Sequence, residues 1–109
     1  MPHTQHQAPR DGELITAQEM AAALTKATLL YADGASQTFS RDGNRTTYVE
    51  RGTHTEGTWE VLADGKFSSF WPPDYRAFYI VRWIVQRGAR IGISFTETHS
   101  GNRFDGLYR

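Results

Sequence analysis

The fold of this chain can be read outward from residues 56–71, whose sequence is EGTWEVLADGKFSSFW. In the first half of this stretch Gly57, Trp59 and Val61 alternate with polar residues, so these three residues would share one face of a strand. An Asp-Gly pair then separates this run from a second apolar one. Because glycine tolerates the positive φ that primed turns require, Asp-Gly between alternating runs is the strongest short-range signal for a β-hairpin. The stretch therefore predicts two antiparallel strands joined by a tight turn.

Similar runs and turn signals continue through the rest of the chain. Turns are indicated at Asp33-Gly34, Asp42-Gly43-Asn44, Asp64-Gly65, Pro72-Pro73-Asp74, Arg87-Gly88 and Ser100-Gly101-Asn102. We expect strands over residues 36–40, 45–51, 56–62, 66–71, 77–86, 90–98 and 103–108, with either a helix end or an extra strand over 28–32. The connections are too short to cross over to a parallel neighbour, so the sheet is predicted to be an antiparallel meander.

Upstream of these runs the pattern is helical, and we expect a helix over residues 16–27. Thr16 and Glu19 have the spacing of a capping box, and Ile15 and Met20 have the spacing of the accompanying hydrophobic staple. The apolar residues of this helix are small, whereas all 14 aromatic residues lie C-terminal to it. We therefore expect a closely packed helix against a sheet that supplies most of the core volume.

Length and composition limit the domain organisation and the partners. A chain of 109 residues fits one domain, which we place at residues 14–109 behind a disordered arm at 1–13. Without cysteine it can form neither a disulfide framework nor a thiolate zinc site. Its 12 basic and 12 acidic side chains cancel, which argues against nucleic acid and acidic membranes as partners. The chain shows no targeting signal and no apolar run near the ~18 residues of a membrane span, so we expect a cytoplasmic protein.

The expected strand 77–86 is apolar on both faces. Its side chains divide into Tyr79, Val81, Trp83 and Val85 on one face and Phe78, Ile80, Arg82 and Ile84 on the other. One face would cover the core, and the other needs cover from the N-terminal helix or from a second subunit. A homodimer is therefore one expectation.

The central segment also resembles a known kind of small barrel. Gly57-Thr58-Trp59-Glu60-Val61, Asp64-Gly65 and Phe70-Trp71 look like the GTW-x-V…DG…W core of short uncharacterised bacterial proteins with a lipocalin-like sheet. The likeness covers residues 35–109. It implies a mainly β fold with one N-terminal helix, in which the meander forms a lipocalin-like (calycin-type) barrel or a strongly bent sheet. It also implies a role in binding a small molecule.

A ligand site in such a sheet would use inner aromatic and apolar side chains together with one cation. We expect the site to be lined by Trp59, Tyr79, Arg82, Trp83, Ile93 and Phe104. Trp59 fits either the floor of a ligand cavity or core packing. Arg82 fits an anchor for a carboxylate or phosphate, a cross-strand pair with a glutamate, or an exposed place on the outer face.

Other chemistry is weakly indicated. His54, Glu56, Glu97 and His99 would form a metal or acid–base set if their strands lay together, and would otherwise form a solvated rim. The chain has no phosphate loop, dinucleotide fingerprint or nucleophile elbow, so we expect no cofactor and no metal.

These observations favour a non-enzymatic binder of a small apolar or weakly acidic molecule. One alternative is a small isomerase or lyase with the cone fold of nuclear transport factor 2, which would hold a carboxylate or histidine in an apolar pocket. A second alternative is a structural module that self-associates through its doubly apolar strand.

Overall fold

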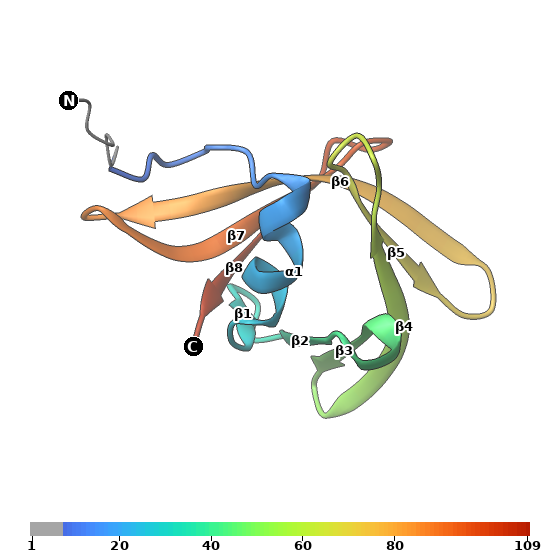
Figure 1. Cartoon of the computed structure of the whole chain (residues 1–109). Helices are drawn as coiled ribbons and strands as arrows, with labels where there is room; N and C mark the ends of the chain where they lie inside the picture. The colour runs from blue at the N-terminus through green and yellow to red at the C-terminus, as the bar shows by residue number, and fades with distance from the viewer. Residues whose placement is uncertain (1–7) are drawn as a thin grey trace.

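The computed structural model describes residues 8–109, in which one α-helix precedes a meander of eight strands (Figure 1). The elements are α1 (Ala17–Thr25), β1 (Leu29–Tyr31), β2 (Ser36–Ser40), the 3-10 turn η1 (Asp42–Asn44), β3 (Arg45–Glu50), β4 (Thr53–Val61), β5 (Phe67–Trp71), β6 (Tyr75–Gln86), β7 (Ala89–Glu97) and β8 (Arg103–Tyr108). Each strand pairs antiparallel with its neighbours in sequence, and β8 pairs with β1. The predicted antiparallel meander is confirmed, and it closes into a barrel.

The predicted strands are all present, with small differences at their ends. β4 begins at Thr53 and β6 begins at Tyr75, because their pairing with β3 and β5 continues as far as the turns. Residues 28–32, for which either a helix end or an extra strand was expected, contain the strand β1. Its pairing with both β2 and β8 closes the barrel. The helix ends at Thr25 rather than at residue 27. Within residues 8–109 no helix has the length and apolar character that a membrane crossing would need.

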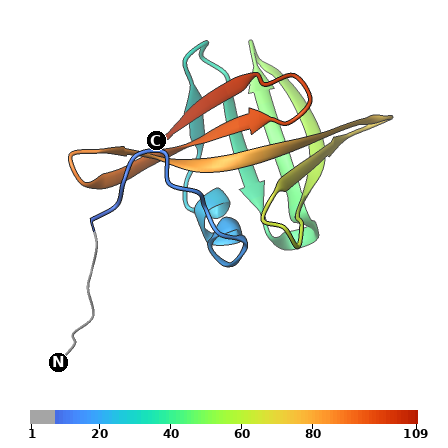
Figure 2. The same cartoon turned by 90° about the horizontal axis from the view of Figure 1, so that it is seen from above.

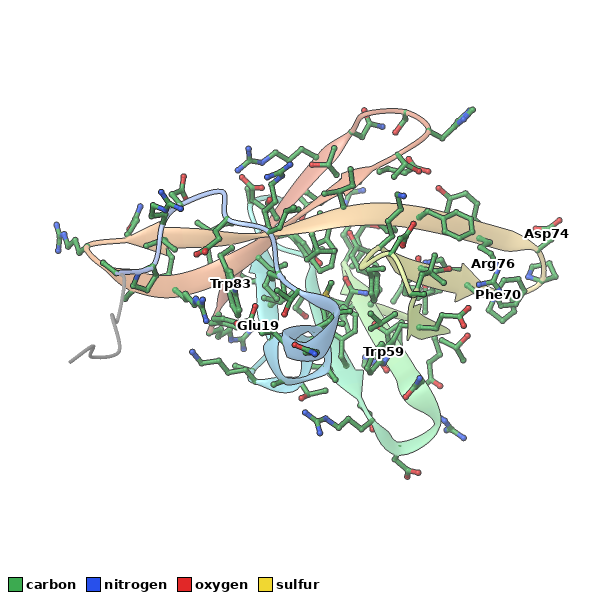
Figure 3. The ribbon with its side chains drawn as sticks, turned by 45° about the horizontal axis from the view of Figure 1, so that its top comes forward. Glu19, Trp59, Phe70, Asp74, Arg76 and Trp83 are labelled. Atoms are coloured by element: carbon green, nitrogen blue, oxygen red, sulfur yellow. The ribbon has the colours of Figure 1, made fainter. Side chains whose placement is uncertain are left out.

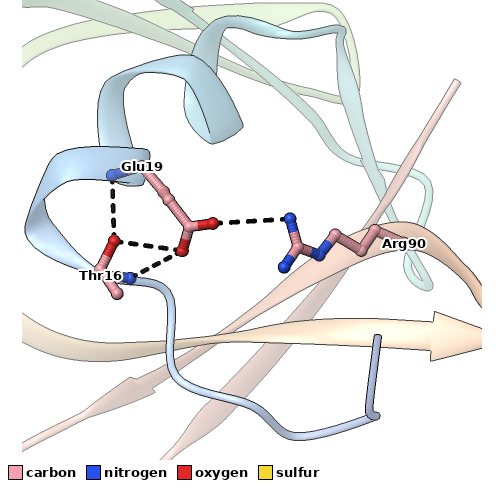
Figure 4. A network of polar contacts seen from close by, with 3 residues as sticks. All are labelled: Thr16, Glu19 and Arg90. Carbon is pink, nitrogen blue, oxygen red and sulfur yellow. Dashed lines mark hydrogen bonds and ion pairs between the residues drawn. The ribbon is translucent and has the colours of Figure 1, made fainter. Parts of the chain in front are cut away.

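α1 begins with the predicted capping box, which Figure 4 shows from close by. The Thr16 hydroxyl accepts a hydrogen bond from the Glu19 amide at 3.2 Å, and the Thr16 amide donates to the Glu19 carboxylate at 3.2 Å. The second carboxylate oxygen of Glu19 lies 3.6 Å from the Arg90 guanidinium on β7. That guanidinium in turn lies over the Trp83 ring of β6, 4.3 Å from its centroid. The cap therefore fixes the start of the helix and connects it to the barrel wall.

α1 closes one end of the barrel. Figure 2 shows the helix at the end opposite the β1–β2 and β3–β4 turns. Met20 and Leu24 are 0% exposed and belong to the same buried cluster as Ile15, Trp59 and Trp83. The helix thus packs on the inner surface of the sheet. It does not cover the outer face of β6, the place where we expected a helix or a second subunit.

An N-terminal segment, residues 11–15, lies along one edge of β6. β6 pairs with β5 over its first half and with β7 over its second half, which leaves an edge of the second half open. The Gly12 amide donates to the Trp83 carbonyl at 2.9 Å, and the Trp83 amide donates to the Glu13 carbonyl at 2.8 Å. Backbone groups at this edge are therefore paired. Part of the arm predicted to be disordered is held against the barrel, and its first seven residues lie outside the described part of the chain.

Aromatic rings fill the barrel next to α1. The Phe67 ring lies 5.9 Å from Phe39 and 5.5 Å from Phe95, measured between centroids, and Trp59 stacks on Phe67 at 6.5 Å. The Trp59 indole nitrogen donates to the carbonyls of Ser40 and Arg45, both at 3.1 Å, so this buried polar group is satisfied. The sheet supplies most of the core volume, as the distribution of aromatic residues predicted.

Candidate ligand-binding site

A cavity opens at the end of the barrel away from α1. Its volume of about 780 Å³ lies within the range of small-molecule sites, roughly 300–1,000 Å³. The β1–β2, β3–β4, β5–β6 and β7–β8 turns surround the opening, because an antiparallel meander places alternate turns at the same end. Phe67 and Phe95 form the floor, with the aromatic core and the helix beneath them. The cavity is therefore open to solvent at one end and closed at the other.

Aromatic side chains form the wall and rim of this cavity. They are Tyr31, Tyr48, Trp71, Tyr75, Tyr79 and Phe104. Ring centroids are 6.1 Å apart for Tyr31 and Tyr48, 6.4 Å for Tyr48 and Trp71, and 6.5 Å for Tyr79 and Phe104. These are the separations of packed aromatic pairs, so the wall contains two groups of adjoining rings, one of Tyr31, Tyr48 and Trp71 and one of Tyr79 and Phe104.

Trp71 lies against β4 because residue 57 is a glycine. A Cβ built on Gly57 would lie 2.7 Å from a ring carbon of Trp71 and would also collide with the Phe70 carbonyl oxygen. The Trp71 indole nitrogen donates to the Ser69 hydroxyl at 3.1 Å, which fixes the ring on the wall. Within residues 56–71, Gly57 and Trp71 therefore shape the cavity, whereas Trp59 packs in the core below it.

A chain of hydrogen bonds holds Tyr31 in the wall. Its hydroxyl donates to the Gln37 side-chain oxygen at 2.7 Å, and the Gln37 amide nitrogen donates to the Thr46 hydroxyl at 2.8 Å. Thr46 donates to the Thr38 carbonyl at 3.0 Å and completes the chain. Burial raises the pKa of Tyr31 far above its usual value, and the nearby Tyr48 phenol adds to the rise. Tyr31 therefore stays neutral, and because its hydroxyl donates its one hydrogen bond to Gln37, its oxygen keeps the capacity to accept a hydrogen bond from a ligand.

The raised tyrosine pKa values predict a loss of stability at alkaline pH. Burial raises the pKa of Tyr108 to about 12, and that of Tyr31 is raised as well, whereas tyrosines in an unfolded chain lose their protons near pH ~10. Above that pH the unfolded state binds fewer protons than the folded state. Each such tyrosine then lowers the free energy of unfolding by up to about 1.4 kcal/mol per pH unit. Urea unfolding between pH ~9 and ~11 measures this fall. The free energy of unfolding should fall less steeply with pH in Tyr108→Phe than in the native protein. An equal slope in that variant would contradict the account.

The rim of the cavity is acidic. Asp33, Glu50 and Asp105 line it together with a single guanidinium, that of Arg103. The Arg103 Nε donates to Asp105 at 2.7 Å, so these two charges cancel. Among the ion pairs of residues 8–109, none involves Asp33 or Glu50. Burial raises the pKa of the Tyr48 phenol, and the negative charges of Asp33 and Glu50 raise it further.

The structure separates the residues that we expected to form one site. Tyr79 and Phe104 line the cavity. Trp59, Trp83 and Ile93 are buried in the core cluster that contains the helix, and Figure 3 shows the two tryptophans near α1. They lie below the cavity floor rather than on its wall.

Arg82 lies on the outer face of β6 and not in the cavity. Strand alternation places its side chain opposite that of its neighbours Val81 and Trp83, which point inward. Its guanidinium is exposed and donates to the Gly12 carbonyl at 2.9 Å, so it holds the N-terminal segment against β6. Of the three interpretations of Arg82, this position corresponds to the exposed one.

The histidines and glutamates considered as a metal or acid–base set do not come together. His54 and Glu56 are on β4, which pairs with β3 and β5, whereas Glu97 is on β7, which pairs with β6 and β8. Within the described residues no three metal-ligating side chains form a cluster. Glu97 instead accepts hydrogen bonds from the Tyr75 hydroxyl at 3.3 Å and the Ser100 hydroxyl at 2.6 Å.

Comparison of the chain with protein families, with curated proteins and with solved structures found no match.

Proposed function

We propose that the protein is a lipocalin-like carrier, similar to short bacterial proteins of that kind, which binds one small molecule at the open end of its barrel. The observation that carries this proposal is the cavity of about 780 Å³ with its aromatic wall. Barrels of about eight strands can hold one small ligand when side chains do not fill the interior. An apolar ligand body would lie on the rings, and the Tyr31 oxygen supports the proposal by offering one acceptor for orientation.

The placement of the charged groups favours binding over catalysis. Asp33, Glu50 and Asp105 are exposed at the rim. An isomerase or lyase of the alternative cone fold would instead need a carboxylate or histidine inside an apolar pocket. Burial there would shift the pKa of that side chain toward the value that proton transfer requires. The interior polar groups Tyr31 and Gln37 already bond to each other. These groups suit recognition of a ligand better than transfer of its protons.

The predicted homodimer and the predicted cytoplasmic location stay predictions. The dimer was expected through the outer face of β6, where Phe78 is 39% exposed, and Leu30 and Leu107, partners on β1 and β8, are 39% and 44% exposed as well. Sedimentation velocity over a range of protein concentrations would detect self-association through this or another face.

A neutral fluorescent dye tests the binding proposal. N-phenyl-1-naphthylamine should bind with one-to-one stoichiometry and gain fluorescence in the apolar cavity. Phe104→Ala removes an aromatic ring from the wall and should weaken binding about tenfold, because a buried aromatic contact contributes roughly 1–2 kcal/mol. Phe78→Ala is the matched control, because Phe78 is similarly exposed (39% against 46% for Phe104) but lies on the outer face of β6. Equal affinity in both variants, or no saturable binding to the native protein, would overturn the proposal.

A further inference from the structure

The charge of the chain is zero in total but unevenly distributed along the barrel. The charged residues in or beside the four turns at the open end are Asp33, Glu50, Arg51, Asp74 and Glu97. Arg103 also flanks the β7–β8 turn, so four carboxylates face two guanidiniums there, and the Arg103 guanidinium is paired with a fifth carboxylate, that of Asp105. An opening lined mainly by charges of one sign raises the local concentration of ligands of the opposite sign. The open end therefore attracts cations and disfavours anions.

Two of these carboxylates lie at the cavity itself. Asp33 and Glu50 both line it together with Tyr48, and their negative charges add to the rise of the Tyr48 pKa that burial causes. Asp33 accepts a hydrogen bond from the Ala35 amide at 2.9 Å, which holds the carboxylate in the β1–β2 turn. Arg51, the cation next to Glu50 in sequence, is not among the lining residues of this cavity, but it lines a smaller hollow that shares Tyr48 and Glu50 with it. The charge that a ligand meets on this side of the cavity is negative.

The aromatic rings beside these carboxylates form a surface that also suits a cation. Tyr31, Tyr48 and Trp71 succeed one another along the wall at centroid separations of 6.1 and 6.4 Å. Their planes are tilted by 46° and 75° to each other, so the three rings do not stack flat on one another, and all three line the cavity. The face of an aromatic ring is electronegative and attracts an ammonium group within about 6 Å. The rings therefore favour a positively charged ligand, and they do so independently of the carboxylates.

From the rings and the carboxylates together, we infer that the ligand is a small organic cation: an ammonium group carried on an aromatic or other apolar body. The ammonium group lies among Tyr31, Tyr48 and Trp71 between the carboxylates of Asp33 and Glu50, and the Tyr31 oxygen accepts one of its hydrogen bonds. The apolar body extends toward Phe67 and Phe95 at the floor. This inference rests on the proposed binding function and defines its ligand class. It replaces the weakly acidic ligand expected from the sequence, because that expectation relied on Arg82, which lies outside the cavity.

Three ligands that share an indole ring test the sign of the charge. Calorimetric titration of the protein with tryptamine (a cation), 3-methylindole (neutral) and indole-3-acetate (an anion) should give at least tenfold tighter binding for tryptamine than for 3-methylindole, with indole-3-acetate weakest. The preference for tryptamine should shrink as salt is raised, because exposed charges are screened. The double variant Asp33→Asn/Glu50→Gln should bind tryptamine only as well as 3-methylindole, whose own affinity should not change. The matched control is Glu56→Gln/Glu60→Gln, which removes two exposed carboxylates from β4 without touching the cavity.

The outcomes separate this inference from the proposed function. If N-phenyl-1-naphthylamine and 3-methylindole bind but tryptamine binds no more tightly, the carrier function stands and the cation inference is wrong. If N-phenyl-1-naphthylamine shows no saturable binding, the proposed function itself fails. A loss of tryptamine preference in the β4 control variant would show that the effect is one of total charge and would also overturn the inference.

Discussion

Replacing Leu24 with alanine should lower the free energy of unfolding by about 3 kcal/mol, within the range known for deep leucine-to-alanine substitutions. Leu24 is 0% exposed and lies in the helix that closes the barrel, in contact with the core cluster. The surrounding strands are held by continuous pairing around the barrel, so they cannot collapse fully into the space left behind. Most of the removed volume should therefore remain as a void. Urea unfolding followed by circular dichroism measures the loss.

Leu14→Ala is the matched control for this substitution. The Leu14 side chain is 54% exposed beside β6, so its truncation should change the free energy of unfolding by less than about 0.5 kcal/mol. If Leu24→Ala were as mild as this control, α1 would not be part of the core. The account of a barrel closed by its helix would then be wrong.

Replacing Gly57 with alanine should destabilise the protein by about 2–3 kcal/mol and also weaken ligand binding. The added methyl group would occupy the place of the Trp71 ring and press on the backbone at Phe70. The ring must therefore move away from the wall, or β4 and β5 must separate. We expect a change in the near-ultraviolet circular dichroism of the tryptophans together with a lower affinity for N-phenyl-1-naphthylamine.

Thr58→Ala provides the control next to Gly57 in the chain. Thr58 is exposed on the outer face of β4, so this variant should keep both the near-ultraviolet spectrum and the dye affinity of the native protein. A Gly57→Ala protein with native stability and native affinity would show that the wall tolerates the displaced indole. Gly57 would then not be the residue that allows Trp71 to lie against β4.

Local sequence patterns were enough to predict most of the helix and strand positions. Alternation and Asp-Gly turns located the strands, because a strand with one buried face must repeat every second residue. Thr16 and Glu19 located the helix start for an equally local reason. Barrel closure was harder to predict, since it depends on β1, a strand of three residues whose partners β2 and β8 lie on opposite sides of it.

The site was predicted only in part, and the reason is geometric. Alternation identifies which residues face the interior, and Trp59, Tyr79 and Phe104 all do so. It does not give the height of each residue along the barrel axis. That height decides whether an inward side chain fills the core, as Trp59 does, or lines the cavity, as Tyr79 and Phe104 do. The height of the floor depends on which end the helix occupies, a long-range feature that no single strand pattern contains.

Trp71 shows what sequence reasoning missed. It belongs to the same stretch, residues 56–71, as Trp59, yet only Trp59 was expected in the site. The available signal was Gly57, since a glycine in a strand interior often marks the close approach of another group. Arg82 shows the opposite error, because the same alternation that turns Trp83 inward places Arg82 outside.

The most direct test of the central claim, that a small molecule binds at the open end of the barrel, uses the indole N–H signals of the three tryptophans. In a ¹⁵N–¹H correlation spectrum, assigned with tryptophan-to-phenylalanine variants, N-phenyl-1-naphthylamine is added until binding saturates. The account predicts a large shift of the Trp71 signal and little change for Trp59 and Trp83, which lie in the core beside the helix. Unmoved signals at saturation, or shifts at Trp59 and Trp83 with none at Trp71, would contradict it.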